Sequence, residues 1–321
     1  MVNGKYNESS GKTPLVSVVM TSYNHEKYIA SAVDSITSQS YDNVQLIVVD
    51  DGSTDSSADI IRKRAKDKGF LFVEKKNGGL VSTINEGFKY VKGDYVVFHG
   101  SDDISVNDRI KIQVDQLSRF PSVGYLNSNL RFIDELGNPF DVLYKEDTDA
   151  EIYTFDDFMR GRAHSTIVSC MFRRSALEKV MPLDESLLSE DFQLFMKITY
   201  AGYQCLAWET VPIINYRVHK AGLSKTKLPA LMRAQMRMIE EYKDHRYYRT
   251  AIVLTKRQIF AAMVVDEKLA ACKFLFKNIQ ILNFSLMRSI GKLFLPKKII
   301  VDIKKILVNS KYSNMGSVDR E

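Results

Sequence analysis

Short apolar runs alternate with amphipathic segments through the first third of the chain. The runs are rich in β-branched residues and lack a polar face, which is typical of strands buried on both sides of a sheet. Four strands are expected, at residues 15–20, 44–49, 70–73 and 94–99. Between the first two, apolar residues recur at helical spacing from Ile29 to Ile36. This alternation predicts βαβ units and a parallel sheet.

The pattern is mixed after the fourth run and becomes helical near the end. Helices are expected near Asp108–Phe120 and Glu190–Tyr200, and strands near Gly124–Ile133, Thr166–Arg173 and Val211–Val218. From Leu228 onward the spacing of apolar residues favours helices only. The chain is therefore expected to hold one α/β domain followed by a helical region.

Acidic pairs follow two of the buried runs, and a third pair opens a predicted helix. The pairs are Asp50-Asp51, Asp102-Asp103 and Glu190-Asp191. Because the carboxyl ends of parallel strands meet at one edge of a sheet, the first two pairs should converge there. Crowded carboxylates repel each other, and a divalent cation bound to a diphosphate would supply the counter-charge. Mn²⁺ or Mg²⁺ is the expected cofactor.

Several ordered motifs resemble the inverting, nucleotide-sugar-dependent glycosyltransferases of family 2. They are VSVVMTSYNHEKYIASAVDSITSQSYDNVQLIVVDDGSTD, NGGLVSTINEGF, GDYVVFHGSDD, LDESLLSEDFQLFMKI and YRVHKAGLS. The resemblance implies the GT-A fold, an α/β architecture with a mixed, mostly parallel sheet flanked by helices. It divides the chain into a disordered tail (1–13), a catalytic domain (14–224, with a nucleotide-binding half 14–103 and an acceptor half 104–224) and a helical C-terminal region (225–321).

The resemblance also implies roles for individual residues. The nucleotide would contact Thr21, Tyr23 and Asp51, and its ribose or the sugar hydroxyls would contact Asp102. The metal would contact Asp103 and His219. Asp191 would be the general base, and His164 and Glu190 would lie on the acceptor side. The chain departs from the common pattern at Thr83 and Ile84, where many relatives have Ala and Arg. The Gln-x-x-Arg-Trp motif of processive synthases is absent, which favours transfer of a single sugar.

Charge and cysteine content narrow the possible partners. The formal net charge is +6, but the segment from Lys273 to Lys311 holds nine basic residues and one acidic residue, so the remainder is slightly acidic. The basic helix expected within 297–311 is amphipathic, which is typical of binding to an anionic membrane surface, with packing on the catalytic domain as the alternative. No nucleic-acid motif accompanies the charge. Three scattered cysteines and the lack of a signal peptide predict a cytoplasmic protein, peripheral on the inner face of the plasma membrane.

The resulting hypothesis is a metal-dependent inverting glycosyltransferase. It would move one sugar from a nucleoside-diphosphate donor, expected to be UDP-linked, to a hydroxyl of a glycan or lipid-linked acceptor in O-antigen or capsule synthesis. The alternative is a nucleotidyltransferase acting on sugar phosphates. That class is expected to have a Gly-rich, basic phosphate loop directly after the first strand, where this chain has Thr21-Ser22-Tyr23-Asn24.

Overall fold

The computed structural model describes residues 13–142, 150–163, 165–219, 228–266, 268–278 and 290. The chain divides into two compact units, residues 1–226 and 227–321. The first unit contains the sheet, and the second contains helices α9 (Leu228–Glu240), α10 (Tyr248–Asp266) and α11 (Lys268–Lys277). A small apolar core around Phe260 and Val264 lies within the second unit. Among the described residues, no helix has the length and apolar character needed to cross a bilayer.

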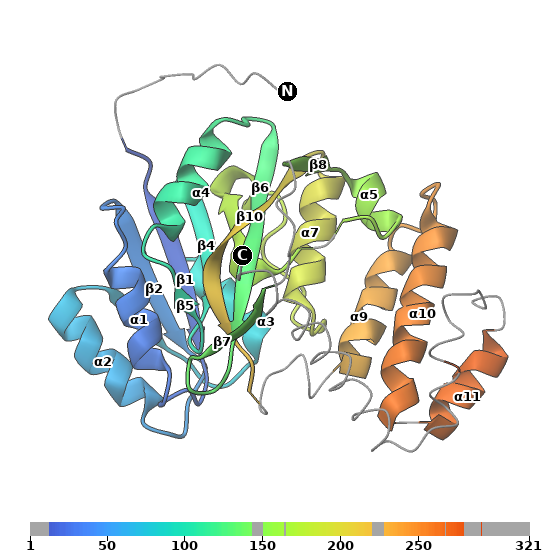
Figure 1. The fold of residues 1–321 in the computed structure, drawn as a ribbon, viewed down its shortest axis with the longest axis horizontal. Coiled ribbons are helices and arrows are strands. Elements are labelled where there is room, and N and C mark those ends of the chain that lie inside the picture. The colour runs from blue at the N-terminus through green and yellow to red at the C-terminus, as the bar shows by residue number, and fades with distance from the viewer. Residues whose placement is uncertain are drawn as a thin grey trace, which may run out of the picture. The chain divides into compact units, whose positions relative to one another are not determined.

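A mixed sheet of ten strands forms the centre of the first unit (Figure 1). Its order is β3 (Leu71–Glu74), β2 (Val44–Asp50), β1 (Val16–Ser22), β4 (Tyr95–Gly100), β9 (Cys170–Arg173), β6 (Val123–Ile133), β10 (Gln204–Arg217) and β5 (Ile104–Ser105). Two short strands lie off this path: β7 (Pro139–Val142) pairs with β6, and β8 (Glu151–Tyr153) pairs with β10. Strands β3, β2, β1 and β4 are mutually parallel, whereas β9 is antiparallel to both of its neighbours. The α/β class and mixed sheet expected from the sequence are confirmed.

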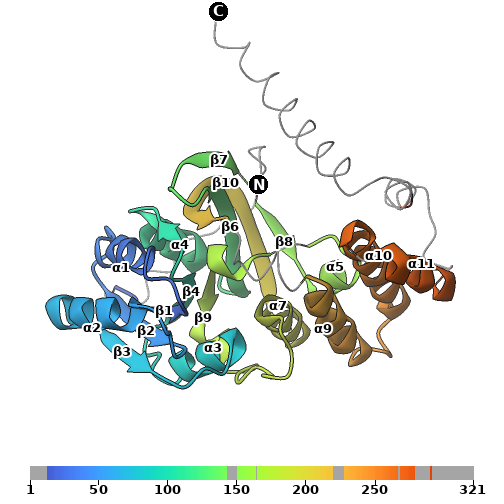
Figure 2. The same ribbon diagram turned by 90° about the horizontal axis from the view of Figure 1, so that it is seen from below.

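Helices cover both faces of this sheet, as the two views show (Figures 1 and 2). One face packs on α1 (Ile29–Thr37), α2 (Ser57–Lys68) and α4 (Arg109–Ser118). The other packs on α3 (Leu80–Phe88), α6 (Arg174–Leu177) and α7 (Glu190–Tyr200). Successive residues of β1 therefore enter different cores: Val18 and Met20 face the first set of helices, and Val19 faces the second. Burial on both faces explains why the runs have no polar side.

The prediction of a strand at Thr166–Arg173 is wrong over the first half of that segment. Residues Ile167–Ser169 form a 3₁₀ turn, η1, and β9 begins only at Cys170. The amide of Thr166 donates to Oδ1 of Asn127 at 3.3 Å, and the Ser169 hydroxyl donates back to the Thr166 carbonyl at 2.9 Å. Side chains thus satisfy backbone groups that a strand would have paired, which apolar periodicity cannot reveal.

Candidate active site

The carboxyl ends of β1, β2 and β4 meet at one edge of the sheet. Ser22 pairs with Asp50, and Thr21 pairs with Gly100, so the segments that follow these strands emerge side by side. The segment after β1 is joined to the segment after β2: the amide of Asn24 donates to Ser53 Oγ, and the amide of His25 donates to Ser57 Oγ, each at 2.9 Å. These bonds hold the first turn of the site in place.

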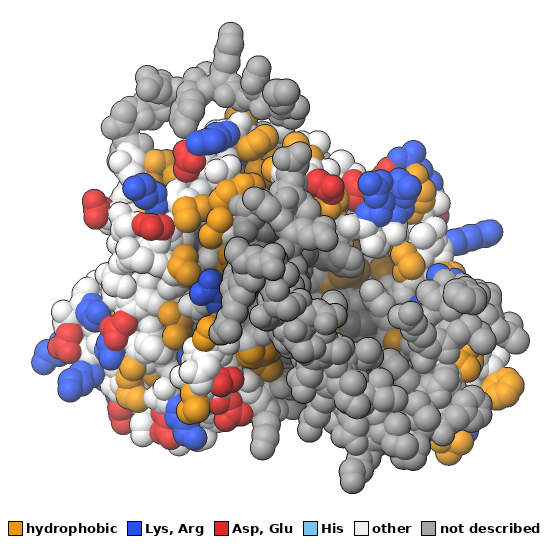
Figure 3. Space-filling view, in the orientation of Figure 1, with side chains coloured by type: hydrophobic (Ala, Val, Ile, Leu, Met, Phe, Trp, Pro, Cys, Tyr) orange, Lys and Arg blue, Asp and Glu red, His pale blue; other side chains and the backbone are white. Residues whose placement is uncertain are grey.

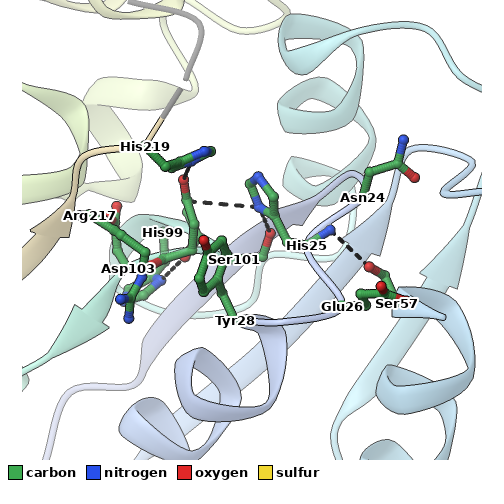
Figure 4. A network of polar contacts seen from close by, with 12 residues as sticks. Asn24, His25, Glu26, Tyr28, Ser57, His99, Ser101, Asp103, Arg217 and His219 are labelled. Carbon is green, nitrogen blue, oxygen red and sulfur yellow. Dashed lines mark hydrogen bonds and ion pairs between the residues drawn. The ribbon is translucent and has the colours of Figure 1, made fainter. Parts of the chain in front are cut away.

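Asp102 lies between two histidines at this edge, His25 and His219, which are labelled in Figure 4. His219 Nε2 is 2.9 Å from one carboxylate oxygen of Asp102, and His25 Nδ1 is 3.9 Å from the other. His25 Nδ1 also lies 2.7 Å from Ser101 Oγ. The ligand atoms of His25, Asp102 and His219 all lie within 4.8 Å of one another. Burial raises the pKa of Asp102, but the hydrogen bond from His219 and the nearby His25 outweigh it and lower that pKa overall.

Arg217 and Tyr28 contact each other, and each contacts a residue of this group. The Arg217 guanidinium lies 4.7 Å from the centre of the Tyr28 ring, and its Nε donates to the Asp102 carbonyl at 2.8 Å. A second nitrogen of the guanidinium donates to the carbonyl of Asp134 at 3.0 Å. Because Arg217 and His219 stand two residues apart at the end of β10, one strand end supplies both the support and the imidazole.

Asp103 occupies the interior rather than the edge. Its side chain is 1% exposed, and its Oδ1 accepts a hydrogen bond from the Arg217 amide at 2.8 Å. Burial and the neighbouring Asp102 raise the pKa of Asp103 well above its ordinary value. The structure therefore brings Asp102, and not the Asp103 expected from the sequence, up to His219. The hydrogen bonds of Asp103 with the Arg217 amide and of Asp102 with His219 set which carboxylate faces outward.

Asp51 holds the loop that precedes α3. Its carboxylate accepts hydrogen bonds from the amides of Gly78 and Gly79, at 2.9 and 2.8 Å, and from Lys75 Nζ at 2.6 Å. Gly52 has a φ of 73°, and a Cβ placed there would lie 2.9 Å from the amide nitrogen of Asn77. Only glycine permits this close approach. Three donors already occupy the carboxylate that was expected to contact the base.

Removing the Asp51 carboxylate should destabilise the fold. Asp51→Ala leaves the Gly78 and Gly79 amides without this acceptor and removes one of the two acceptors of the half-buried Lys75 ammonium, and losing hydrogen-bond partners in this way costs about 1–3 kcal/mol. Urea unfolding measures the change. Asp59→Ala is the matched control, because the exposed Asp59–Arg62 pair on α2 contributes about 0–1 kcal/mol. Equal losses for the two variants would contradict this assignment.

Thr21 and Tyr23 lie where the sequence places them, at the end of β1. Thr21 is half-buried, and its carbonyl accepts the Ser101 amide at 3.2 Å, which ties the strand to the Ser-Asp-Asp turn. The Tyr23 side chain is 46% exposed. The amide of Asp51 donates to the Ser22 carbonyl at 2.8 Å, so Tyr23 and Asp51 leave neighbouring strands at the same edge. A base could therefore lie on the Tyr23 ring.

Glu190 and Asp191 form the first turn of α7. The Ile167 amide in η1 donates to Asp191 Oδ1 at 3.0 Å. Burial raises the pKa of Asp191 to about 6, and burial together with Asp191 raises the pKa of Glu190 to about 8. The two neighbouring carboxylates therefore titrate together, and both are protonated more readily than ordinary carboxylates.

Two expectations fall on residues outside the described part of the chain, and two contributors to the site were missed. His164 and nearly all of the basic tail, from 279 onward apart from residue 290, lie outside the described residues.

His25 and Arg217 were not expected to take part in the site. His25 is in the turn directly after β1, so its position at a strand end was the available signal; the contacts of Arg217 had no signal in the sequence.

Charges of both signs are mixed on the outer surface of α2 (Figure 3). Arg62 pairs with Asp59 at 2.5 Å and with Glu74 at 2.8 Å, and Lys68 pairs with Asp34 at 2.9 Å. Arg62 and Lys68 of this helix thus have acidic partners in the structure. This part of the surface is a solvated helix face of the ordinary kind.

Two solved structures resemble this chain in fold. The S. aureus protein TarS (residues 1–349, in complex with UDP-GlcNAc) has a TM-score of 0.63 and 17% identity, over 85% of this chain and 82% of that one. The mannosyltransferase PcManGT from Pyrobaculum calidifontis, in complex with GDP-Man and Mn²⁺, has a TM-score of 0.59 and 17% identity, over 97% and 89%. These similarities confirm the GT-A fold expected from the sequence.

Sequence comparison identifies the family. An uncharacterized glycosyltransferase of Haemophilus influenzae is 29% identical over 216 residues, which is 67% of this chain and 83% of the relative. The family described as "Glycosyl transferase family 2" matches residues 17–181, about half of the chain, and this range includes the edge of the sheet with His25 and Asp102. The chain therefore belongs to glycosyl transferase family 2.

Proposed function

We propose that this glycosyltransferase moves one sugar, with inversion, from a UDP-linked donor to a hydroxyl of a glycan or lipid-linked acceptor in surface polysaccharide synthesis. The placement of Asp102 between His25 and His219 carries the proposal, because it sets a cation-binding group at the edge where nucleotides bind in α/β sheets. The similar proteins in complex with UDP-GlcNAc and GDP-Man support a nucleotide-sugar donor.

The donor atoms of this group fit a divalent cation of the manganese type. One carboxylate oxygen and two imidazole nitrogens lie within 4.8 Å of one another. Mg²⁺ strongly prefers oxygen ligands, whereas transition metals accept imidazole, so the set favours a transition-metal ion over Mg²⁺, and the Mn²⁺ in the similar PcManGT supports Mn²⁺. Asp102, His25 and His219 would hold the ion, and Asp103 would support the turn from inside. When bound, the ion would neutralise charge that develops on the leaving diphosphate.

The chain's own residues would carry the remaining tasks. Tyr23 would stack on the base, and Asp51 would order the loop that precedes α3. Asp191, ionised near neutral pH, would take the proton of the acceptor hydroxyl as that oxygen attacks the anomeric carbon. Glu190, next to Asp191 on the same turn of α7, would lie on the acceptor side.

Turnover should depend on pH through the Asp191 carboxylate. Its pKa is raised to about 6, and only the ionised form can accept a proton, so kcat should rise between pH 5 and 7 and then level off. An aspartate of ordinary pKa would give a flat profile there. The profile of kcat at saturating donor and acceptor measures this. If kcat of the Glu190→Gln variant shows the same rise between pH 5 and 7, the rise belongs to Asp191. If the rise disappears in that variant, it belongs to Glu190.

A donor screen tests the proposed function directly. The full chain is incubated with UDP-, GDP-, dTDP- and CDP-sugars with Mn²⁺ or Mg²⁺, and release of the nucleoside diphosphate is scored. Release from UDP-sugars with Mn²⁺ is expected, and the product's anomeric configuration by NMR reports inversion. Formation of a nucleotide sugar from a sugar phosphate and UTP would instead support a nucleotidyltransferase. Association of the basic tail with anionic membranes stays a prediction, because the tail lies outside the described residues.

A further inference from the structure

Two polar side chains of α4 are completely buried between the sheet and η1. Arg109 and Gln113 stand one helical turn apart, and both are 0% exposed. Arg109 Nε donates to Gln113 Oε1 at 3.2 Å, and the other acceptors around the guanidinium are a hydroxyl and two backbone carbonyls. The charge of Asp103 acts on Arg109, but all of these hydrogen-bond acceptors are neutral, and burying an arginine among neutral acceptors is costly.

On one side, Arg109 connects to the Ser-Asp-Asp turn. Its Nη1 donates to Ser105 Oγ at 3.0 Å, and Ser105 Oγ lies 3.0 Å from His99 Nε2. His99 Nδ1 lies 2.6 Å from the Gly100 carbonyl, which can only accept, so Nδ1 carries the proton. Burial and the nearby charge of Arg109 lower the pKa of His99 to about 3, so the ring is neutral and Nε2 accepts from Ser105. The chain of bonds has one direction and ends beside Asp102.

On the other side, Arg109 and Gln113 hold η1. Arg109 Nη2 donates to the Val168 carbonyl at 2.6 Å, and Gln113 Nε2 donates to the Ser169 carbonyl at 2.9 Å. Oδ1 of Asn127, on β6, accepts from the Ser169 hydroxyl at 3.1 Å. These contacts fix the turn whose Ile167 amide donates to Asp191. The side chains that hold the turn are therefore all anchored in the interior.

We propose that Arg109 is a positioning residue that connects the Asp102 turn to the turn that holds Asp191. The inference rests on the proposed roles of these two aspartates. The guanidinium of Arg109 donates to both Ser105 and Val168. It therefore fixes the spacing between the donor side, at Asp102, and the acceptor side, at Asp191. Attack opposite a leaving group needs this alignment, and a displacement of about 1 Å can cost about 100-fold in rate.

Arg109→Lys tests the connection, because it keeps the charge but cannot reach both acceptors from a single nitrogen. We expect kcat for sugar transfer to fall about 10–100-fold, as for other supporting contacts around catalytic groups. The KM for the donor and the affinity for UDP with Mn²⁺, measured by calorimetry, should change several-fold less than kcat, because Arg109 does not itself contact Asp102. Arg119→Lys is the matched control: its half-exposed pair with Asp115, at the end of the same helix, is remote from these turns, and kcat should not change.

Ser105→Ala tests the same connection with a smaller change, should Arg109→Lys fail to fold by thermal unfolding. It should lower kcat with little change in KM, and the double variant should be no slower than the slower single variant, because the two bonds act in series. Multiplying effects, or a loss of UDP affinity equal to the loss of kcat, would overturn the proposal. The two proposals fail separately: an active Asp191→Asn variant refutes the base, whereas an inactive one together with a fully active Arg109→Lys refutes only the connection.

Discussion

Asp191→Asn is expected to lower turnover by about 100- to 10,000-fold, the usual contribution of a positioned general base. The amide keeps the size of the side chain, and its Oδ1 can still accept the Ile167 amide, so η1 and α7 should stay in place. Donor affinity should change little, because the proposed nucleotide contacts lie at the ends of β1, β2 and β4. Single-turnover rates and calorimetric titration with UDP and Mn²⁺ separate the two quantities.

Asp67→Asn, on the exposed face of α2, controls for the chemical change itself and should retain full activity. A parallel loss of UDP affinity and of turnover in Asp191→Asn would place Asp191 in the donor site. Unchanged turnover would remove it from the mechanism. Either result would redirect the search for the base to Glu190, which stands next to it on the same turn of α7.

Asp102→Asn should abolish tight binding of Mn²⁺ in the presence of UDP, with a loss of at least about 100-fold. Even residues that only support metal ligands contribute about 10–100-fold, and Asp102 supplies the sole carboxylate of the group with His25 and His219. Water-proton relaxation or electron paramagnetic resonance of Mn²⁺ measures the affinity directly, without activity as a readout.

Asp103→Asn is the matched variant one position along the chain. The buried side chain should still accept the Arg217 amide as an asparagine, so Mn²⁺ affinity should stay within a few-fold of the parent. The reverse pattern, with Asp103→Asn losing the ion and Asp102→Asn retaining it, would restore the assignment expected from the sequence and show that the Ser-Asp-Asp turn rearranges when the ion binds.

Much of the architecture follows from local patterns. The strands of the first half are short, β-branched and apolar on both faces, so their burial and their parallel arrangement could be predicted, as could the helix that begins at Glu190. The convergence of Asp51 and Asp102 at one edge followed from parallel topology alone. The strand expected from Thr166 could not be predicted correctly, because its first half takes its hydrogen bonds from Asn127, about 40 residues away.

The division between sequence and tertiary structure has a physical basis. Periodicity decides which segments are strands and which are helices, since it depends on neighbours a few residues apart. The order of the motifs along the chain indicates the family. The outward turn of Asp102, the burial of Asp103 and the approach of His25 depend on contacts with β10 and with the loop after β2. Hydrogen bonds across such distances are set only when the sheet has formed, so the proposed choice of metal-facing carboxylate and the proposed link through Arg109 depend on the folded structure.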